Sequence, residues 1–403
     1  MTGTDIFNTY KYFLIFIFLF ILYIFGKIHI LETEQKNNEL ESNNTNYTNQ
    51  KEIILSKGRK FIDKCLNSTD NKIYEINQNP IITTIIPSFN CEKTISSSIH
   101  SAGYQNISNI EIIIVDDYSE DNSKEIINKF MAYDKRIKLI ENKKNMGTLY
   151  SRSIGALMAK GNYIMCLDND DLFFDEDVFD FLYKQAQKDN LDLVSFRVIV
   201  SKNYYDEISK MEDYRFFGFE NNLYLSQPSL GIFPINLKGI FSIHDNEIWS
   251  KCIKSEIYKK AVNLLGIERY SKYVSWAEDT SINFIIFNIA ESFKYTHKIG
   301  YFHVRISSAA TFNQNINIKL FGELFFLDVM YDFSKNTSDK NYVVEYALYI
   351  QNTYKTGNFS EYSKDNNYKY LKMILSKIVK CPYITPSNIE KIKHYFKNFY
   401  NYT

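Results

Sequence analysis

The chain has 403 residues, enough for one large domain with an appendage or for two domains. Apolar residues make up 45% of it and charged residues 23%, which excludes a disordered tail. Acidic and basic residues balance at 47 each, so the net charge gives no electrostatic reason to expect nucleic acid as a partner.

An uncharged segment rich in Phe, Ile and Leu runs from Tyr12 to Gly26. As a helix this segment would be about 22 Å long, so it must extend in both directions to cross a hydrocarbon core of roughly 30 Å. A cleaved signal peptide is the competing interpretation, but no small-x-small cleavage site follows Gly26. We predict that residues 1–31 form a single N-terminal transmembrane anchor.

The following residues 32–78 are polar and Asn-rich, which predicts a stem or linker. Charges on the two sides of the apolar segment are similar, so they do not fix its orientation. Several N-x-Ser/Thr sequons favour a lumenal main domain and a glycoprotein, at Asn43, Asn46, Asn67, Asn106, Asn336, Asn358 and Asn401. We therefore predict a single-pass type II membrane protein of the Golgi or endoplasmic reticulum.

From Ile81 onward, β-branched runs alternate with segments of helical spacing. Strands are expected at 81–86, 110–115, 137–140 and 163–167, and helices at 91–104, 120–133 and 149–160. This alternation predicts an α/β fold with a doubly wound, mostly parallel, Rossmann-like sheet. Ligands on such sheets bind at the carboxyl ends of the strands, so polar residues that directly follow a strand are the candidates for a site.

Three of the expected strands end in polar residues, and the most acidic end is Asp168-Asn169-Asp170-Asp171. Neighbouring carboxylates repel one another and burial favours their neutral form, and a divalent cation relieves both problems. Asp168 and Asp170 would project to the same side of an extended segment. Hard oxygen ligands of this kind suit Mg²⁺ or Mn²⁺ bridging a diphosphate. A solvated Asp-rich turn is the alternative, but a second acidic strand end, Asp116-Asp117, favours the metal site.

Four motifs in this order resemble family 2 glycosyltransferases of the GT-A fold: Ile-Pro-Ser-Phe-Asn, Val-Asp-Asp-Tyr-Ser-Glu-Asp, Asn-x-Gly-x-x-x-x-Arg-x-x-Gly and Leu-Asp-Asn-Asp-Asp. The resemblance implies a GT-A catalytic domain at about residues 79–310 and a UDP- or GDP-linked sugar donor. It also implies a nucleotide-sugar site formed by Pro87, Asn90, Asp116, Asp117, Asn145, Gly147, Arg152 and Asp168. Asp168 and Asp170 would hold the Mn²⁺ or Mg²⁺ ion, with Asp171 assisting. The family usually has Gly at the position of Tyr118.

A carboxylate that can deprotonate the acceptor hydroxyl is needed for an inverting transfer. Trp276-Ala277-Glu278-Asp279-Thr280 precedes an apolar helical pattern, so its acids lie at a helix N-terminus, where the dipole favours ionised carboxylates. An ordinary helix cap with a first-turn acid is the alternative. The segment is similar to the family's Glu-Asp motif, which implies that Asp279 is the base and that Glu278 orients the acceptor or the loop. The family more often has Gly at the position of Ala277.

The only two tryptophans are Trp249 and Trp276. Either could stack on a sugar face, but core packing is the favoured interpretation. Two roles remain open in the expected strand at 301–305. One is that His303 is a further metal ligand, and the other is that Arg305 contacts the diphosphate. Residues 311–403 carry no recognisable chemistry and are predicted to be a helical C-terminal extension.

Together these features predict an inverting hexosyl- or N-acetylhexosaminyltransferase that acts on a glycan, glycoprotein or lipid acceptor. A nucleotidyltransferase is the first alternative, but the first strand is not followed by the Gly-rich, Lys- or Arg-bearing loop that would hold a triphosphate. A non-catalytic sugar-binding membrane protein is the second alternative. The joint presence of Asp117, Asp168, Asp170 and Asp279 argues against it.

Overall fold

The computed structural model describes residues 53–68, 73–75, 78–201, 215–217, 224–225, 247–304, 316–334, 343–344, 346–348, 350, 366–382 and 384–395. The chain forms two compact units, Met1–Lys60 and Phe61–Thr403. Of the first unit, residues 53–60 are described, and they are helical. The predicted anchor at 1–31 and most of the predicted stem lie outside the described residues. In the described ranges, no helix combines the length and the apolar character needed to cross a membrane.

The first half of the second unit alternates strands and helices as predicted. Its elements are β1 (Ile82–Ser88), α2 (Ile95–Gly103), β2 (Ile110–Asp116), α3 (Ser123–Tyr133), β3 (Ile137–Glu141), α4 (Thr148–Met158) and β4 (Tyr163–Cys166). Every residue of β1 and β2 is buried, because these strands present side chains to helices on both faces of the sheet.

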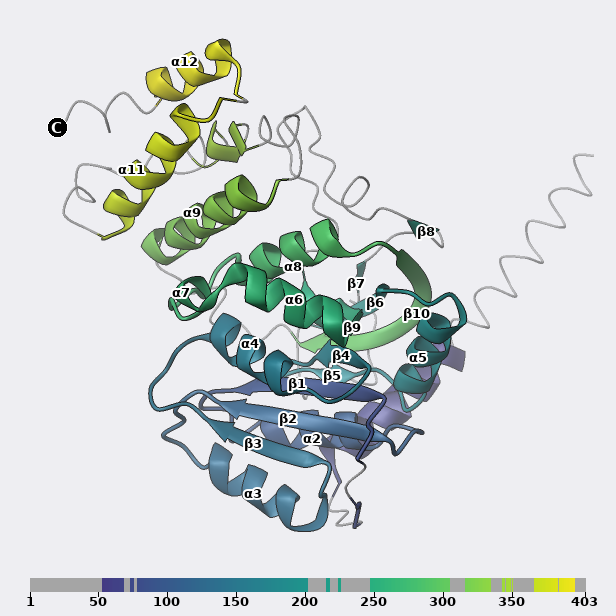
Figure 1. Ribbon diagram of the computed structural model, residues 1–403. Helices are drawn as coiled ribbons and strands as arrows, with labels where there is room; N and C mark the ends of the chain where they lie inside the picture. The colour runs from purple at the N-terminus through teal and green to yellow at the C-terminus, as the bar shows by residue number, and fades with distance from the viewer. Residues whose placement is uncertain are drawn as a thin grey trace, which may run out of the picture. The chain divides into compact units, whose positions relative to one another are not determined.

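The strands of this half are parallel, in the order β3-β2-β1-β4. From β1 to β2 and from β2 to β3 the chain moves in the same direction along the sheet. Right-handed crossovers therefore place the connecting helices α2 and α3 on the same face. The return from β3 to β4 places α4 on the other face, together with α6 and α8 (Figure 1). Ser88 is in register with Asp116. The polar strand ends therefore lie at one edge of the sheet, as predicted.

Beyond β4 the sheet becomes mixed. It continues in the order β4-β9-β6-β10-β5, with β7 paired to β6 and β8 paired to β10. These strands are β5 (Leu172–Phe173), β6 (Leu193–Ser201), β7 (Arg215–Phe217), β8 (Tyr224–Leu225), β9 (Lys251–Lys254) and β10 (Phe293–Val304). Only β6 and β10 pair in parallel here, since β9 and β5 run antiparallel to their neighbours. The sequence predicted the parallel half well and did not foresee the antiparallel strands.

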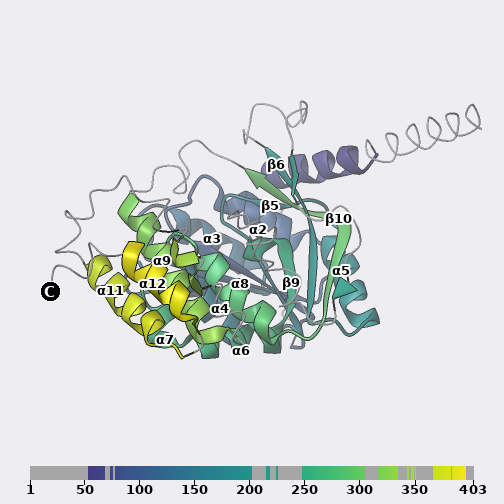
Figure 2. The ribbon, with the colours of Figure 1, turned by 90° about the horizontal axis from the view of Figure 1, so that it is seen from above.

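Further helices pack around this mixed half and in the C-terminal region. They are α5 (Val178–Lys188), the short η3 (Ile248–Ser250), α6 (Ser255–Leu265), α7 (Ile267–Tyr270), α8 (Glu278–Ile289), α9 (Ile316–Phe333), α11 (Asn366–Val379) and α12 (Pro386–Tyr395). The predicted helical C-terminal region is confirmed. Helix α9 packs between α8 and α11, as both views show (Figures 1 and 2). The edge-to-face rings of Phe284 and Phe326 join α8 to α9.

Among the described residues, four residues other than glycine have a positive φ: Asn90, Tyr118, Asn190 and Ala277. Tyr118 has φ 72° and Ala277 has φ 57°. Tyr118 and Ala277 are the two positions at which the family resemblance leads one to expect Gly, a residue that adopts a positive φ without strain. Asn190 also has a positive φ of 48°, but the short polar side chain of Asn tolerates this region better.

We expect Ala277→Gly to raise the free energy of unfolding by about 1 kcal/mol, because a residue with a Cβ atom is strained in this conformation. Urea unfolding monitored by circular dichroism measures the change. Asn190→Gly is the matched control and should leave the free energy nearly unchanged. A loss of stability in Ala277→Gly would contradict the strain argument.

Helix α4 approaches the sheet through Gly155. A Cβ atom there would lie 2.6 Å from Ile85 Cγ2, well inside van der Waals contact. We expect Gly155→Ala to destabilise the protein, because overpacking of about 1–3 kcal/mol outweighs a gain in helix propensity of about 1 kcal/mol. In an Ile85→Ala background the clashing atom is gone, so the same substitution should stabilise. Urea unfolding of the unmodified protein, the two single variants and the double variant tests this reversal. An equal change in the free energy of unfolding on Gly155→Ala in both backgrounds would refute it.

Candidate functional site

The acidic loop after β4 is fixed by polar contacts from three other elements. The hydroxyl of Ser98 in α2 donates to the carbonyls of Asn169 and Asp171, at 3.0 Å and 2.8 Å. The Asn169 amide donates to the Pro87 carbonyl at 2.9 Å, and the Asp168 backbone N–H donates to the Tyr301 hydroxyl oxygen at 3.0 Å. The loop conformation is therefore set by β1, α2 and β10 together.

Asp171 is fully buried and both of its carboxylate oxygens have partners. One oxygen lies 2.8 Å from His303 Nδ1, and the other accepts the backbone N–H of Val304 at 2.8 Å. Burial alone would lower the pKa of His303, but the Asp171 carboxylate outweighs it and raises this pKa to about 9. Asp171 thus ties the acidic loop to the end of β10, which leaves Asp168 and Asp170 as the carboxylates that can meet a cation.

Asp170 is in a different position. Burial and then the nearby carboxylates of Asp171 and Asp168 raise its pKa to about 8. Among the described residues, no other residue donates a hydrogen bond to its carboxylate. A carboxylate with these neighbours is a good ligand for a hard cation, which would favour its ionised form. Within the same described residues, no group of three or more His, Cys, Asp and Glu side chains has the spacing of a complete metal site.

Arg152 of α4 joins the acidic loop to the start of α8. Its Nη2 donates to Asp168 Oδ1 at 2.5 Å, and its Nη1 donates to Asp279 Oδ1. The Arg152 side chain is 5% exposed, whereas Asp168 and Asp279 are 27% and 20% exposed. The two carboxylates, which the sequence assigned to different tasks, therefore lie on either side of one buried guanidinium group.

The carboxylates of Glu278 and Asp279 at the start of α8 are half-buried beside this guanidinium. Burial raises the pKa of Asp279 and Arg152 opposes that effect, while the backbone N–H of Ile248 donates to its second oxygen at 3.3 Å. Burial and then the Asp279 charge raise the pKa of Glu278 to about 7. The predicted dipole effect at the helix N-terminus is thus opposed by burial. A carboxyl group whose pKa rises toward neutrality is a better proton acceptor.

Asp117 holds the loop that leads into α4. Its carboxylate accepts the Asn142 side-chain amide at 2.8 Å and the backbone N–H groups of Met146 and Gly147 at 2.8 Å and 2.7 Å. Asn145 also accepts the Gly147 N–H, at 3.2 Å. Asp117 and Asn145 therefore shape the backbone of the predicted nucleotide site, a task that their sequence pattern did not reveal.

The other predicted nucleotide residues lie at the same edge of the sheet. Asp116 is buried and accepts the Ser119 backbone N–H at 3.0 Å. Asn90 accepts the Glu120 N–H at 2.9 Å, which joins the end of β1 to the end of β2. Pro87 is buried in β1. The structure thus brings together all the predicted strand-end residues.

Trp249 belongs to the core, as the favoured interpretation had it. Its ring stacks on Tyr301 with centroids 4.6 Å apart and on His303 with centroids 5.3 Å apart. Only 9% of Trp249 is exposed, so its faces are not available to a sugar. Arg305 lies outside the described residues. Sequence reasoning missed Ser98 and Tyr301, whose hydroxyls support the acidic loop, and no local pattern marks either residue.

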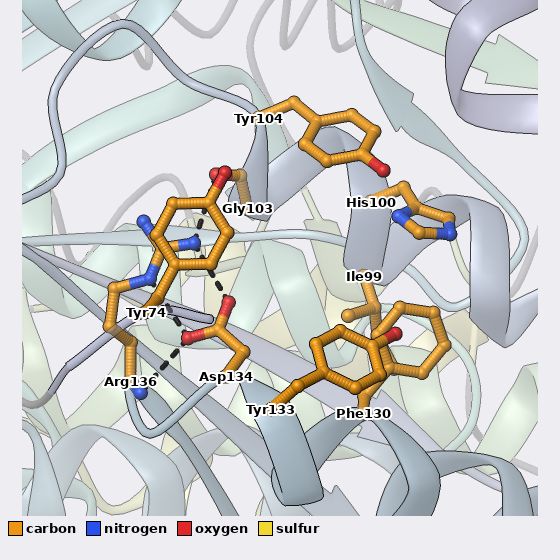
Figure 3. A pocket seen from close by; sticks show the side chains of 9 residues that line it. All are labelled: Tyr74, Ile99, His100, Gly103, Tyr104, Phe130, Tyr133, Asp134 and Arg136. Carbon is orange, nitrogen blue, oxygen red and sulfur yellow. Dashed lines mark hydrogen bonds and ion pairs between the residues drawn. The ribbon is translucent and has the colours of Figure 1, made fainter. Parts of the chain in front are cut away.

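A small pocket lies at the C-terminal ends of α2 and α3 (Figure 3). Arg136 is buried there, paired with both oxygens of Asp134, and its guanidinium lies 3.7 Å from the centroid of the Tyr74 ring. The Tyr74 backbone also bonds to Tyr133 and Lys135. These contacts tie the segment before β1 to the start of β3. No predicted site residue lines this pocket.

Residues 83–245 match the family model described as glycosyl transferase family 2. The chain is 35% identical over 114 residues to glycosyltransferase GlyG of Streptococcus pneumoniae, covering 28% of this chain and 38% of that protein. It is 43% identical over 91 residues to the UDP-Glc:alpha-D-GlcNAc-diphosphoundecaprenol beta-1,3-glucosyltransferase WfaP of Escherichia coli, covering 23% and 36%. The chain thus spans well under two thirds of the length of these relatives.

The crystal structure of S. aureus TarS 1-349 in complex with UDP-GlcNAc has a similar fold. The TM-score is 0.53 at 14% sequence identity, and the alignment covers 79% of this chain and 89% of that one. The superposition reaches well beyond residue 245, where the family model stops. With the strand-end acids and the sheet described above, these findings show that the chain carries a family 2 glycosyltransferase domain with the GT-A fold.

Proposed function

We propose that this protein is an inverting glycosyltransferase that moves a sugar from a UDP-sugar to an acceptor hydroxyl, with Asp279 as the base. The observation that carries the proposal is the double ion pair of Arg152 with Asp168 and Asp279. This contact supports the proposal because Asp168, which would face the donor diphosphate, and Asp279, which would face the acceptor, bind the same guanidinium group. A single displacement needs these two groups on opposite sides of one reacting carbon.

Asp168 and Asp170 would hold a divalent cation, Mn²⁺ or Mg²⁺, together with oxygens of the diphosphate. The cation would neutralise charge on the leaving nucleoside diphosphate. The chain's own residues fit this arrangement, because Asp170 lies beside two other carboxylates without a hydrogen-bond donor from another described residue. Asp168 would contribute its carboxylate to holding the cation, and Asp171 would keep the loop attached to β10.

Asp279 would accept the proton of the acceptor hydroxyl. Its burial favours the protonated state after the transfer, and Arg152 keeps it ionised before the transfer. Glu278, whose pKa is also raised by burial, would orient the acceptor or the loop. Inversion predicts a product whose anomeric configuration is opposite to that of the donor, which NMR of the product reads directly.

A UDP-linked donor is favoured over a GDP-linked one. The name of the Escherichia coli relative specifies UDP-glucose, and the TarS structure contains UDP-GlcNAc. Hexosyl or N-acetylhexosaminyl transfer is consistent with both. Release of UDP or GDP from a panel of nucleotide sugars identifies the donor, with thermal stabilisation as an independent readout of binding. A response to nucleoside triphosphates alone would favour a nucleotidyltransferase instead.

Anchoring through residues 1–31, with a glycan, glycoprotein or lipid as acceptor, completes the proposal. The type II orientation in the Golgi or endoplasmic reticulum is proposed on the apolar segment and the sequons alone. Partition of the full chain with membranes after carbonate extraction tests the anchor, and recovery in the supernatant would refute it.

We expect Asp279→Asn to lower donor turnover by about 10²–10⁴-fold, the range for loss of a general base. Its affinity for UDP should stay close to that of the unmodified protein, because the amide keeps the shape of the side chain. Asp180→Asn on α5, a surface carboxylate paired with Lys184, is the matched control and should keep full turnover. Near-normal turnover in Asp279→Asn would rule out this base.

We expect EDTA to abolish turnover and Mn²⁺ to restore it. Asp170→Asn should abolish the stabilisation that Mn²⁺ and UDP together give in a thermal melt. In metal-free protein at pH 8.5 the same variant should melt at a higher temperature, because it removes a half-buried carboxylate whose pKa is raised to about 8. This gain should shrink as the pH falls below 8, where Asp170 is protonated. Turnover that survives EDTA would overturn the metal assignment.

A further inference from the structure

Helix α9 of the C-terminal region packs closely against the backbone of the residues just before α8. A Cβ atom on Gly322 would lie 2.0 Å from the Trp276 carbonyl oxygen and 2.7 Å from its carbonyl carbon. Only glycine leaves room for this approach. Trp276 leads directly into the left-handed Ala277, which is the residue just before α8. The backbone position of the first turn of α8 is therefore bounded by α9.

The next residue of α9 holds the Trp276 side chain. Glu323 Oε1 accepts the indole N–H at 3.0 Å, and Glu323 Oε2 accepts the Tyr346 hydroxyl. Glu323 and Tyr346 are 8% and 5% exposed, so water does not compete effectively for these bonds. One turn earlier, Lys319 Nζ lies 4.7 Å from the centroid of the Trp276 ring.

The loop that contains Trp276 also reaches the predicted nucleotide site. A Cβ atom on Gly147 would lie 3.3 Å from the Tyr273 ring and 3.5 Å from the Val274 carbonyl oxygen. Gly147 is the residue whose N–H binds Asp117. Residues 271–277 thus lie between α9 and the start of α4, and they lead into the turn that carries Asp279.

We propose that α9 positions the base: Gly322 and Glu323 fix Trp276, and Trp276 fixes the backbone from which Asp279 reaches Arg152. Both are positioning residues, because they act through Trp276 and not on the reacting atoms. This inference rests on the proposed function, since it gives the C-terminal region a part in the transfer reaction.

The test compares Gly322→Ala, Glu323→Ala and Glu323→Gln with Asp332→Asn. Asp332 is on the same helix but pairs with Arg269 and Lys377 instead of Trp276, so it is the matched control. The kcat for UDP release from UDP-GlcNAc, or from the donor that the panel identifies, should fall about tenfold or more in the two Ala variants, with little change in KM. Glu323→Gln should retain most activity, because its amide oxygen still accepts the indole N–H.

Fluorescence gives a readout of the same contact that does not depend on activity. In a Trp249→Phe background Trp276 is the single tryptophan. Its emission should shift to longer wavelength in Glu323→Ala and Gly322→Ala, and should stay in place in Glu323→Gln and Asp332→Asn.

Three results would count against the inference. An emission shift with undiminished kcat would overturn the positioning role alone. An equal loss of kcat in Asp332→Asn would assign the effect to general destabilisation and would overturn it as well. Absence of donor turnover in the unmodified protein would overturn the proposed function and this inference with it, which separates that failure from the other two.

Discussion

The contact of Arg152 with two carboxylates is the interaction on which the candidate site depends. A buried guanidinium needs compensating charge, and the fold supplies it from the end of β4 and from the start of α8. β4 belongs to the parallel half of the sheet, whereas α8 leads into β10 of the mixed half. The ion pairs thus join the parallel half to the mixed half at the place where the donor and acceptor would meet.

Much of the remaining polar structure at this edge supports backbone conformation. Asp117 holds the loop before α4, and Asp116 holds the turn after β2. Asn90 joins the ends of β1 and β2, and Asp171 attaches the acidic loop to β10. Acidic residues in a motif are easily interpreted as ligands for the substrate. Here several of them accept backbone N–H groups, and this is how loops at an edge of a sheet become rigid enough to present a site.

Sequence patterns predicted the elements from β1 to β4 because their apolar runs are long and their periods are clear. They also predicted which strand ends share an edge, because parallel pairing follows from the alternation of strands and helices. The antiparallel strands β9 and β5 were missed because they are short and lack a distinctive period. The partners of Arg152 were missed because Asp279 is far from it in the chain, and a contact of this kind depends on tertiary packing.

The family resemblance contributed what spacing could not, namely the roles of individual residues and the positions of two expected glycines. At Tyr118 and Ala277 the left-handed backbone is present although the glycine is not. Two sets of contacts could be found from the structure alone: those of Ser98 and Tyr301 with the acidic loop, and that of Glu323 with Trp276. Each acts across a long sequence separation and leaves no local pattern.

The close approach of Gly322 to Trp276 bears on where the domain ends. Residues 280–288 of α8 are buried on every side, and α9 provides one of the surfaces that cover them. A boundary drawn from sequence at residue 310 would cut between two helices that share one core. The folding unit is therefore longer than the segment that defines the family. Substitutions in α9 are constrained by its packing against the catalytic half, whereas an independent appendage would tolerate them.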